Sequence, residues 1–293
     1  MSEAIGLGPE VVSIGFLIIG SMKSGTTSLF RDLGKNPGIF VPEDKEPDAL
    51  ISDFVLTVEG RLKYLQLFAN SQPGQICGEA STSYTKLPKF EGAAERAYET
   101  CGPNTKIVYL VRDPIERIVS HHHHEFIKGG AGPDIDKEVR CNPDYVDFSR
   151  YMTQLKPWLR VFGAQNVKVI RFEDYLSERR QIVDDVTAFI GVSPRSDLID
   201  ASQNYNASDN KPVVRGLWRK IYRNRIYREY LRKLMPWSLR YRIRHVVLPK
   251  GASRPAPPSL DTERWLTIEL AQEVDELSRF CGSHVPLWPR WQS

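Results

Sequence analysis

The first thirty residues constrain the fold of this chain most strongly. An apolar run over residues 11–20 leads directly into the polar sequence Ser21-Met22-Lys23-Ser24-Gly25-Thr26-Thr27-Ser28. The run has the composition of a buried strand, and the polar segment after it predicts a short loop that opens a helix. Backbone N–H groups and the positive end of the helix dipole would converge on this loop. It is therefore a predicted site for a phosphate or sulfate group.

The order of residues in this loop argues against an ordinary ATP or GTP site. In the nucleoside-triphosphate loop, G-x-x-x-x-G-K-[ST], the lysine follows the second glycine. Here Lys23 precedes Gly25 by two residues. The loop therefore predicts a different phosphorylated donor. A kinase or NTPase of the P-loop type stays open as an alternative, because the apolar run 108–111 before Asp113 imitates a metal-binding strand.

A second strand-to-helix junction follows the apolar run at residues 106–111. Arg112 comes directly after this run, and Pro114 stands where a helix would begin, a position that proline favours because its missing N–H has no partner there anyway. Ser120 would lie about two turns into that helix. Arg112 and Ser120 are thus candidates to bind a second phosphate.

These two motifs resemble those of the sulfotransferases that use 3′-phosphoadenosine 5′-phosphosulfate (PAPS) as donor. The resemblance implies that Lys23, Ser24, Gly25, Thr26, Thr27 and Ser28 bind the 5′-phosphosulfate, and that Arg112 and Ser120 bind the 3′-phosphate. It favours the branch that includes bacterial carbohydrate sulfotransferases and the heparan sulfate N- and 3-O-sulfotransferases. It extends from about residue 14 to residue 288, and it implies no metal requirement.

Further matches imply roles on the acceptor side. Lys45-Glu46-Pro47 is similar to a family segment whose glutamate is the proposed catalytic base, which implies that role for Glu46. The segment 78–84 is similar to one that lines the family's cleft, although Ala80 stands where the heparan enzymes have lysine. Residues expected to bind the acceptor are Asp48, Ser81, Tyr84, His122 and His124.

A proline-containing stretch near the C-terminus has two interpretations. Lys250-Gly251-Ala252-Ser253-Arg254 resembles the loop with which the heparan sulfate enzymes close over the adenosine end of the donor, which would add these five residues to the donor site. The alternative is a proline-rich linker.

The chemistry implied is in-line transfer of a sulfuryl group to a hydroxyl or amine of a glycan, glycolipid or small-molecule acceptor. As in phosphoryl transfer, catalysis would rest mainly on positioning and electrostatics. Lys23 and the N–H groups of the loop would neutralise the leaving phosphate, and Glu46 would take the acceptor proton. Asp48, His122 and His124 are competing bases. The sequence does not identify the acceptor, the position sulfated or the oligomeric state.

The distribution of apolar runs predicts an α/β fold. Candidate strands at 11–20, 75–79, 106–112 and 166–172 alternate with helical stretches, the rhythm of a P-loop-like central parallel sheet with helices on both faces. The expected organisation is a single domain over residues 1–293. It includes a basic helical segment at 215–250 and a C-terminal helix at 261–281 with Asp261 as its N-cap.

Charge is concentrated in the segment 215–250. It holds twelve Lys or Arg residues and a single acid, Glu229, although the whole chain carries only +4. The segment could be a solvated helix pair, could bind an acidic substrate, or could contact a membrane surface. A non-catalytic protein that binds membranes or polyanions through this segment is a further alternative. No nucleic-acid partner is expected.

Histidine and cysteine patterns indicate no metal site. In the run 121–124 only His121 and His124 share a helix face, and no third ligand is suggested nearby. The four cysteines are widely spaced, without a C-x-x-C motif. The N-terminus lacks the basic start of a signal peptide. We therefore expect a cytoplasmic location.

Overall fold

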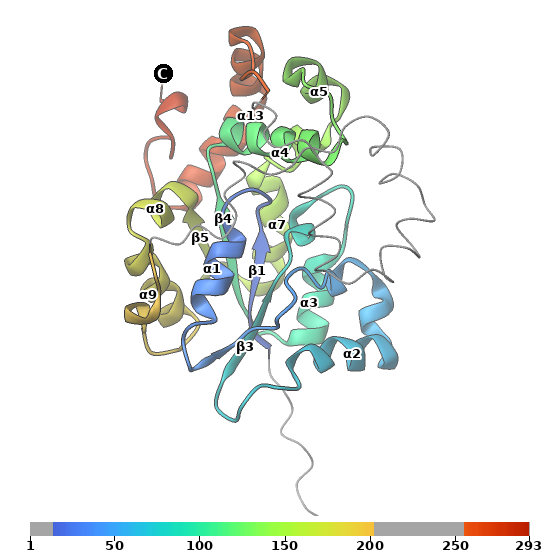
Figure 1. The fold of residues 1–293 in the computed structure, drawn as a ribbon, viewed down its shortest axis with the longest axis vertical. Coiled ribbons are helices and arrows are strands. Elements are labelled where there is room, and N and C mark those ends of the chain that lie inside the picture. The colour runs from blue at the N-terminus through green and yellow to red at the C-terminus, as the bar shows by residue number, and fades with distance from the viewer. Residues whose placement is uncertain (1–13, 202–254, 293) are drawn as a thin grey trace, which may run out of the picture.

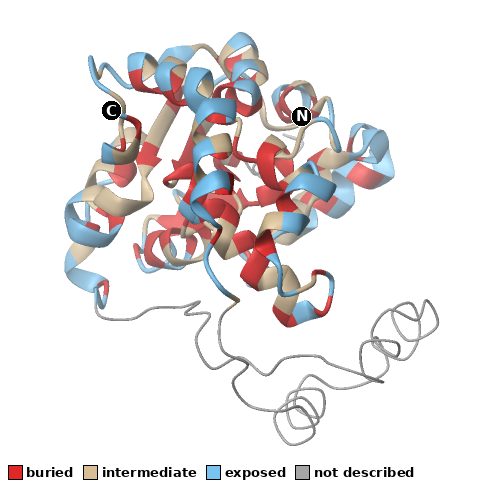
Figure 2. Ribbon diagram, turned by 90° about the horizontal axis from the view of Figure 1, so that it is seen from above, coloured by how far each residue is buried: buried red, intermediate tan, exposed pale blue. Residues whose placement is uncertain are grey.

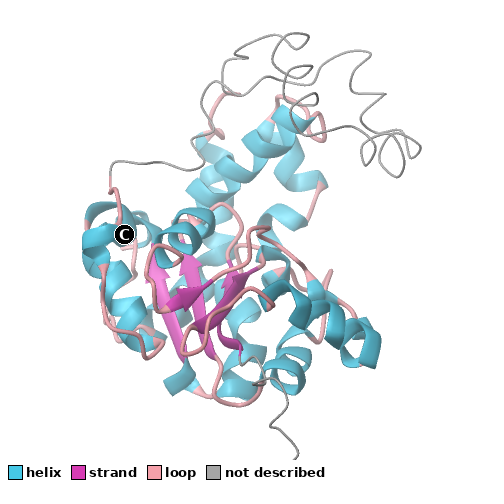
Figure 3. Cartoon of the chain, turned by 60° about the horizontal axis from the view of Figure 1, so that its bottom comes forward, coloured by secondary structure: helices cyan, strands magenta, loops and turns pink. Residues whose placement is uncertain are grey.

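The computed structural model describes residues 14–201 and 255–292, and these residues are built around one central sheet (Figure 1). Five strands run in the order β2-β3-β1-β4-β5, and each neighbouring pair is parallel. The strands are β1 (Ile14–Gly20), β2 (Ile39–Phe40), β3 (Ile76–Ala80), β4 (Lys106–Val111) and β5 (Val167–Arg171). In Figure 3 they form one continuous magenta layer among the helices.

Ten α-helices are described over these residues. They are α1 (Thr26–Leu33), α2 (Val58–Leu65), α3 (Ala93–Cys101), α4 (Pro114–Lys128), α5 (Ile135–Cys141), α6 (Asp144–Asp147), α7 (Tyr151–Phe162), α8 (Phe172–Ser177), α9 (Arg179–Phe189) and α13 (Leu260–Phe280).

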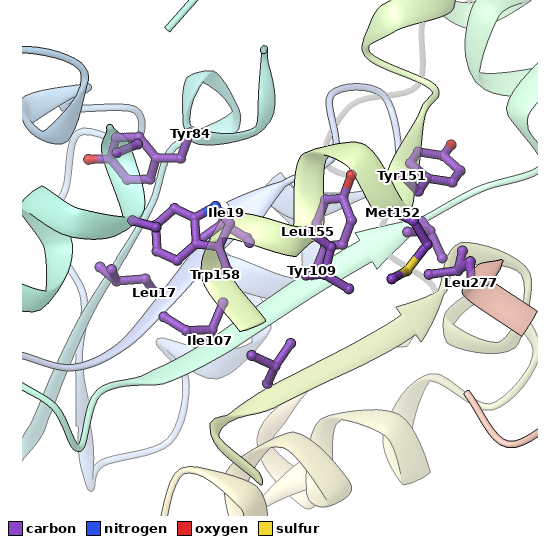
Figure 4. Close-up of a cluster of buried hydrophobic side chains, with 14 of the residues drawn as sticks. Leu17, Ile19, Tyr84, Ile107, Tyr109, Tyr151, Met152, Leu155, Trp158 and Leu277 are labelled. Carbon is purple, nitrogen blue, oxygen red and sulfur yellow. The ribbon is translucent and has the colours of Figure 1, made fainter. Parts of the chain in front are cut away.

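Successive residues of the central strands point to opposite faces of the sheet and belong to two separate cores. Leu17 and Ile19 of β1 pack with apolar residues of α3, α7 and α13, whereas Phe16 and Ile18 pack with those of α1, α8 and α9. Figure 4 shows the first core, with Trp158 and Leu155 of α7 against the sheet. Buried residues gather between the helices in Figure 2. Burial on both faces explains why these strands are continuously apolar.

The expected α/β class with a central parallel sheet and helices on both faces is confirmed. The four expected strands form, but the two-residue β2 was not predicted, because so short a strand has no periodicity to detect. The predicted N-cap Asp261 is wrong. Ser259 caps α13 and accepts a hydrogen bond from the Thr262 N–H, and Asp261 lies in the first turn instead. The basic segment 215–250 and the loop 250–254 lie outside the described residues.

The strand order places the loops of interest side by side. From β1 the chain moves through β2 to β3 on one side of the sheet, and β4 then returns to pair with the other side of β1. Ligands of open α/β sheets bind beyond the carboxyl ends of the strands at such a reversal. The loop after β1 and the start of α4 after β4 both lie there.

Candidate active site

The loop between β1 and α1 presents free backbone N–H groups. Gly25 is left-handed, with φ of +84°, and no side chain caps the helix that it precedes. Within the described part of the chain, the N–H groups of Gly25, Thr26 and Thr27 donate to no protein acceptor. Ser24 is buried and its Oγ lies 2.6 Å from Ser21 Oγ, so it holds the loop together. Three unpaired donors at a helix N-terminus form an anion cradle.

The cradle opens into a hollow of about 600 Å³, which we call the basic hollow. Its walls are Met22, Lys23, Gly25, Thr26, Thr27, Ser28, Glu46, Thr82, Lys86, Arg112, Ser120, His124, Lys128, Phe172, Tyr175, Leu176 and Arg179. Ser120, His124 and Lys128 follow one another at intervals of four residues, so they lie along one face of α4. The predicted donor residues of the cradle and of the β4–α4 junction thus meet in one space, except Ser24, which lies behind it.

Arg112 is held at the junction by bonds from several directions. The Tyr151 hydroxyl donates to the Arg112 carbonyl oxygen at 2.7 Å, and an Arg112 guanidinium nitrogen lies 3.3 Å from Glu116 Oε2. The guanidinium also sits over the Phe172 ring, 5.1 Å from its centre. The cation is therefore fixed at one end of the basic hollow.

Glu46 is the acidic residue that the structure brings into this wall. Its N–H donates to the carbonyl oxygen of Ala80 at 3.0 Å, which ties the loop after β2 to the end of β3. Its Oε1 accepts hydrogen bonds from Thr82 Oγ1 at 3.2 Å and from Lys45 Nζ at 2.9 Å. Burial raises its pKa, but the charges of Lys45 and Lys86 and these hydrogen bonds outweigh burial, and the net shift of the pKa is downward. Glu46 is therefore ionised at neutral pH and able to accept a proton.

A second hollow of about 600 Å³ lies on the other side of Glu46, which lines both spaces. Asp48 and Lys63 contribute charge to it, and Phe54, Val55 and Leu67 contribute apolar surface. A molecule could therefore approach Glu46 from a space outside the basic hollow.

Ser81 and Tyr84, expected to bind the acceptor, line neither hollow and belong to a buried network around Glu79. Glu79 accepts hydrogen bonds from the hydroxyls of Tyr84 at 2.6 Å, Ser81 at 3.0 Å and Tyr64 at 3.3 Å. Ser81 Oγ in turn accepts the N–H of Asp48, a residue with φ of +51°. This network holds the loop that carries Glu46. Sequence reasoning missed Glu79, because a strand glutamate gives no signal until its hydroxyl partners are known.

The histidines separate into two groups. His124 lines the basic hollow, whereas His122 Nε2 lies 2.9 Å from the Gly132 carbonyl oxygen, away from both hollows. His121 stacks on Phe148 and contacts the Tyr145 ring at a tilt, and burial lowers its pKa to about 2, so that it stays neutral. The placement favours His124 over His122 as a ligand-contacting residue. Among the described residues, no three His, Cys, Asp or Glu side chains gather as a metal site would require.

Sequence reasoning missed eight further residues of the basic hollow, four of which carry an ionisable group: Lys86, Lys128, Tyr175 and Arg179. Lys128 could have been found, since it continues the four-residue spacing of Ser120 and His124 along the predicted helix. Arg179 comes from α9, with its guanidinium bound to Asp32 of α1. Nothing local in the sequence indicates that pairing, because 147 residues separate the partners.

The parallel sheet, the reversal of strand order and the amide cradle together define a P-loop-like α/β fold with an anion cradle at the carboxyl end of its sheet. The family model of the sulfotransferase domain matches residues 14–215, more than two thirds of the chain. The chain therefore belongs to the sulfotransferase domain family, as the sequence motifs predicted.

Curated relatives carry sulfotransferase names. The membrane-associated sulfotransferase kil1 of Dictyostelium discoideum is 32% identical over 123 residues, covering 41% of this chain and 25% of that protein. Carbohydrate sulfotransferase 15 of Mus musculus is 23% identical over 270 residues, covering 69% of this chain and 48% of that protein. The chain thus spans half or less of the length of these two relatives.

A sulfotransferase structure from Alicyclobacillus acidocaldarius has a TM-score of 0.64, with 23% identity over 92% of this chain and 96% of that one. At this identity the likeness establishes the fold. None of the described helices combines the length and hydropathy needed to span a membrane. All four cysteines are free thiols.

Proposed function

We propose that the protein transfers a sulfuryl group from PAPS to a hydroxyl or amine of a glycan, glycolipid or small-molecule acceptor. One observation carries the proposal: a cradle of three unpaired amides beside Lys23 and a hydrogen-bonded, ionised Glu46 line a single hollow. An anionic donor bound at the cradle would thereby lie in the same hollow as a proton acceptor for the reaction. Family membership supports the reaction class.

The residues of the basic hollow fit a donor with phosphate groups at two ends. Lys23 and the amides of residues 25–27 would hold the phosphosulfate, and Arg112 with Ser120 would hold the 3′-phosphate. When bound, PAPS supplies an activated sulfuryl group. Glu46 would orient the acceptor and take its proton, a contribution of about 10²- to 10⁴-fold in rate.

The residues that line the second hollow beside Glu46 indicate which classes of acceptor could bind there. Lys45 and Lys63 could meet an anionic or polar glycan, and Phe54, Val55 and Leu67 could meet an apolar portion of a glycolipid or small molecule. The relatives named for carbohydrate acceptors support a glycan. A cytoplasmic location and contact of the segment 215–250 with a membrane surface stay predictions.

Calorimetric titration with 3′-phosphoadenosine 5′-phosphate (PAP), the product of the donor, tests the proposal. We expect the wild type to bind PAP more tightly than ATP, and Lys23→Ala and Arg112→Ala to weaken that binding at least tenfold each. Lys35→Ala, which changes an exposed lysine just beyond α1, is the control and should bind PAP as the wild type does. A preference for ATP, or no PAP binding, would refute the donor assignment.

A further inference from the structure

Lys86 lies at the Glu46 end of the basic hollow, just after the short helical turn Thr82–Thr85 that follows β3. Thr82 at the start of this turn donates to Glu46, and Lys86 at its end interacts electrostatically with the same carboxylate. The turn and the residue after it therefore present a hydroxyl and an ammonium group to the proposed base.

The Lys86 ammonium group has few hydrogen-bond or ion-pair partners among the described residues around it. It donates to Ser83 Oγ at 3.4 Å and lies 6.0 Å from the centre of the Phe148 ring. Within the described ranges no carboxylate comes within ion-pair distance of it. Burial lowers its pKa, opposed by the charges of Glu46 and Asp48 and assisted by those of Lys89 and Lys128. A half-buried cation with spare donors faces the hollow, and a lysine has three N–H donors to offer.

We propose that Lys86 is a further catalytic residue, whose ammonium group binds the sulfuryl group while it moves from donor to acceptor. The inference rests on the proposed function. In the transfer, a bond forms between the acceptor atom and sulfur while the bond from sulfur to the bridging phosphate oxygen breaks. The electron pair of that bond leaves on PAP, and the acceptor proton goes to Glu46. Lys86 stabilises the charge on the sulfuryl oxygens, and Lys23 stabilises the charge on the leaving phosphate.

Position separates Lys86 from the other lysines of the hollow. Lys23 lies in the loop beside the amide cradle, where a phosphate would bind, and Lys128 lies at the far end of the α4 face that begins at Ser120. Lys86 follows the turn whose Thr82 binds the base, and the atom under attack must also lie near that base for the acceptor proton to transfer.

The test uses the fact that PAP lacks the sulfuryl group that PAPS carries. Dissociation constants of both nucleotides are measured for the wild type, Lys86→Met, Lys86→Arg and the control Lys89→Met. Lys89 is three residues away and its side chain is 55% exposed, in an ion pair with Asp144. We expect Lys86→Met to weaken PAPS binding about tenfold or more, the size of one charge-assisted hydrogen bond, and to change PAP binding less than twofold. Lys89→Met should change neither constant.

A kinetic measurement accompanies the binding data. Cleavage of PAPS to PAP and inorganic sulfate, with water as acceptor, should slow about 10²-fold or more in Lys86→Met and recover in part in Lys86→Arg. Equal weakening of PAPS and PAP would show that Lys86 serves the nucleotide as a whole and would overturn the inference. Unchanged PAPS binding would overturn it as well. A wild type that binds neither nucleotide would instead refute the proposed function.

Discussion

Asp32 of α1 and Arg179 of α9 form a buried ion pair beside the basic hollow, and replacing either partner should destabilise the protein strongly. Asp32 accepts hydrogen bonds from Arg179 at 2.7 and 2.8 Å and from the Tyr175 hydroxyl at 2.5 Å. The side chains are 0% and 6% exposed. Asp32→Asn keeps the shape of the side chain but removes the negative charge that binds the guanidinium. Such losses cost about 3–5 kcal/mol of unfolding free energy.

Urea denaturation followed by tryptophan fluorescence measures this loss. With a slope of about 3 kcal/mol per molar urea, the midpoint should fall by about 1 M or more. The double variant Asp32→Asn with Arg179→Met should cost much less than the two single changes added together, because it removes both charges. Asp197→Asn is the control, since the Asp197–Arg195 pair is exposed and its loss should leave the midpoint nearly unchanged. A cost below about 1 kcal/mol for Asp32→Asn, or additive single changes, would refute the reasoning.

Two other predictions concern Glu79 and Gly25. Burial raises the pKa of Glu79 to about 7, so the folded state keeps the proton of this carboxyl up to a higher pH than the unfolded state does. The protonated carboxyl therefore stabilises the folded state at low pH, and this stabilisation is lost as the pH rises through 7. Between pH 5 and pH 8 the wild type should lose about 2–3 kcal/mol of unfolding free energy relative to Glu79→Gln. Urea denaturation at both pH values measures this, and a difference between wild type and variant that is the same at pH 5 and pH 8 would contradict it. Gly25→Ala should abolish PAP binding, because the new Cβ would lie 2.6 Å from a Phe172 ring atom at a φ of +84°. Gly74→Ala is the control, with the same φ and open space, and loss of PAP binding in both variants would point to backbone strain alone.

The strand, the loop and the helix at the N-terminus were predictable because each depends on neighbouring residues. A long apolar run predicts a buried strand, and Lys23 with Gly25 and hydroxyl residues at a helix start predicts an anion cradle wherever the rest of the chain lies. Pro114 likewise marked the start of α4 correctly. Such local signals also determined the α/β class and the family resemblance.

Only the tertiary structure decided which residues surround the cradle. The sequence does not show that Glu46 bonds to Ala80 and Thr82, that Glu79 gathers three hydroxyls, or that Arg179 reaches Asp32. These contacts depend on strand order and packing, which join segments that are distant along the chain. For the same reason Ser81 and Tyr84 lie inside the protein, while Lys86 faces the hollow. The sequence by itself therefore determined the anion cradle and the strand-to-helix junctions, and the packing of distant elements determined how the site is built around them.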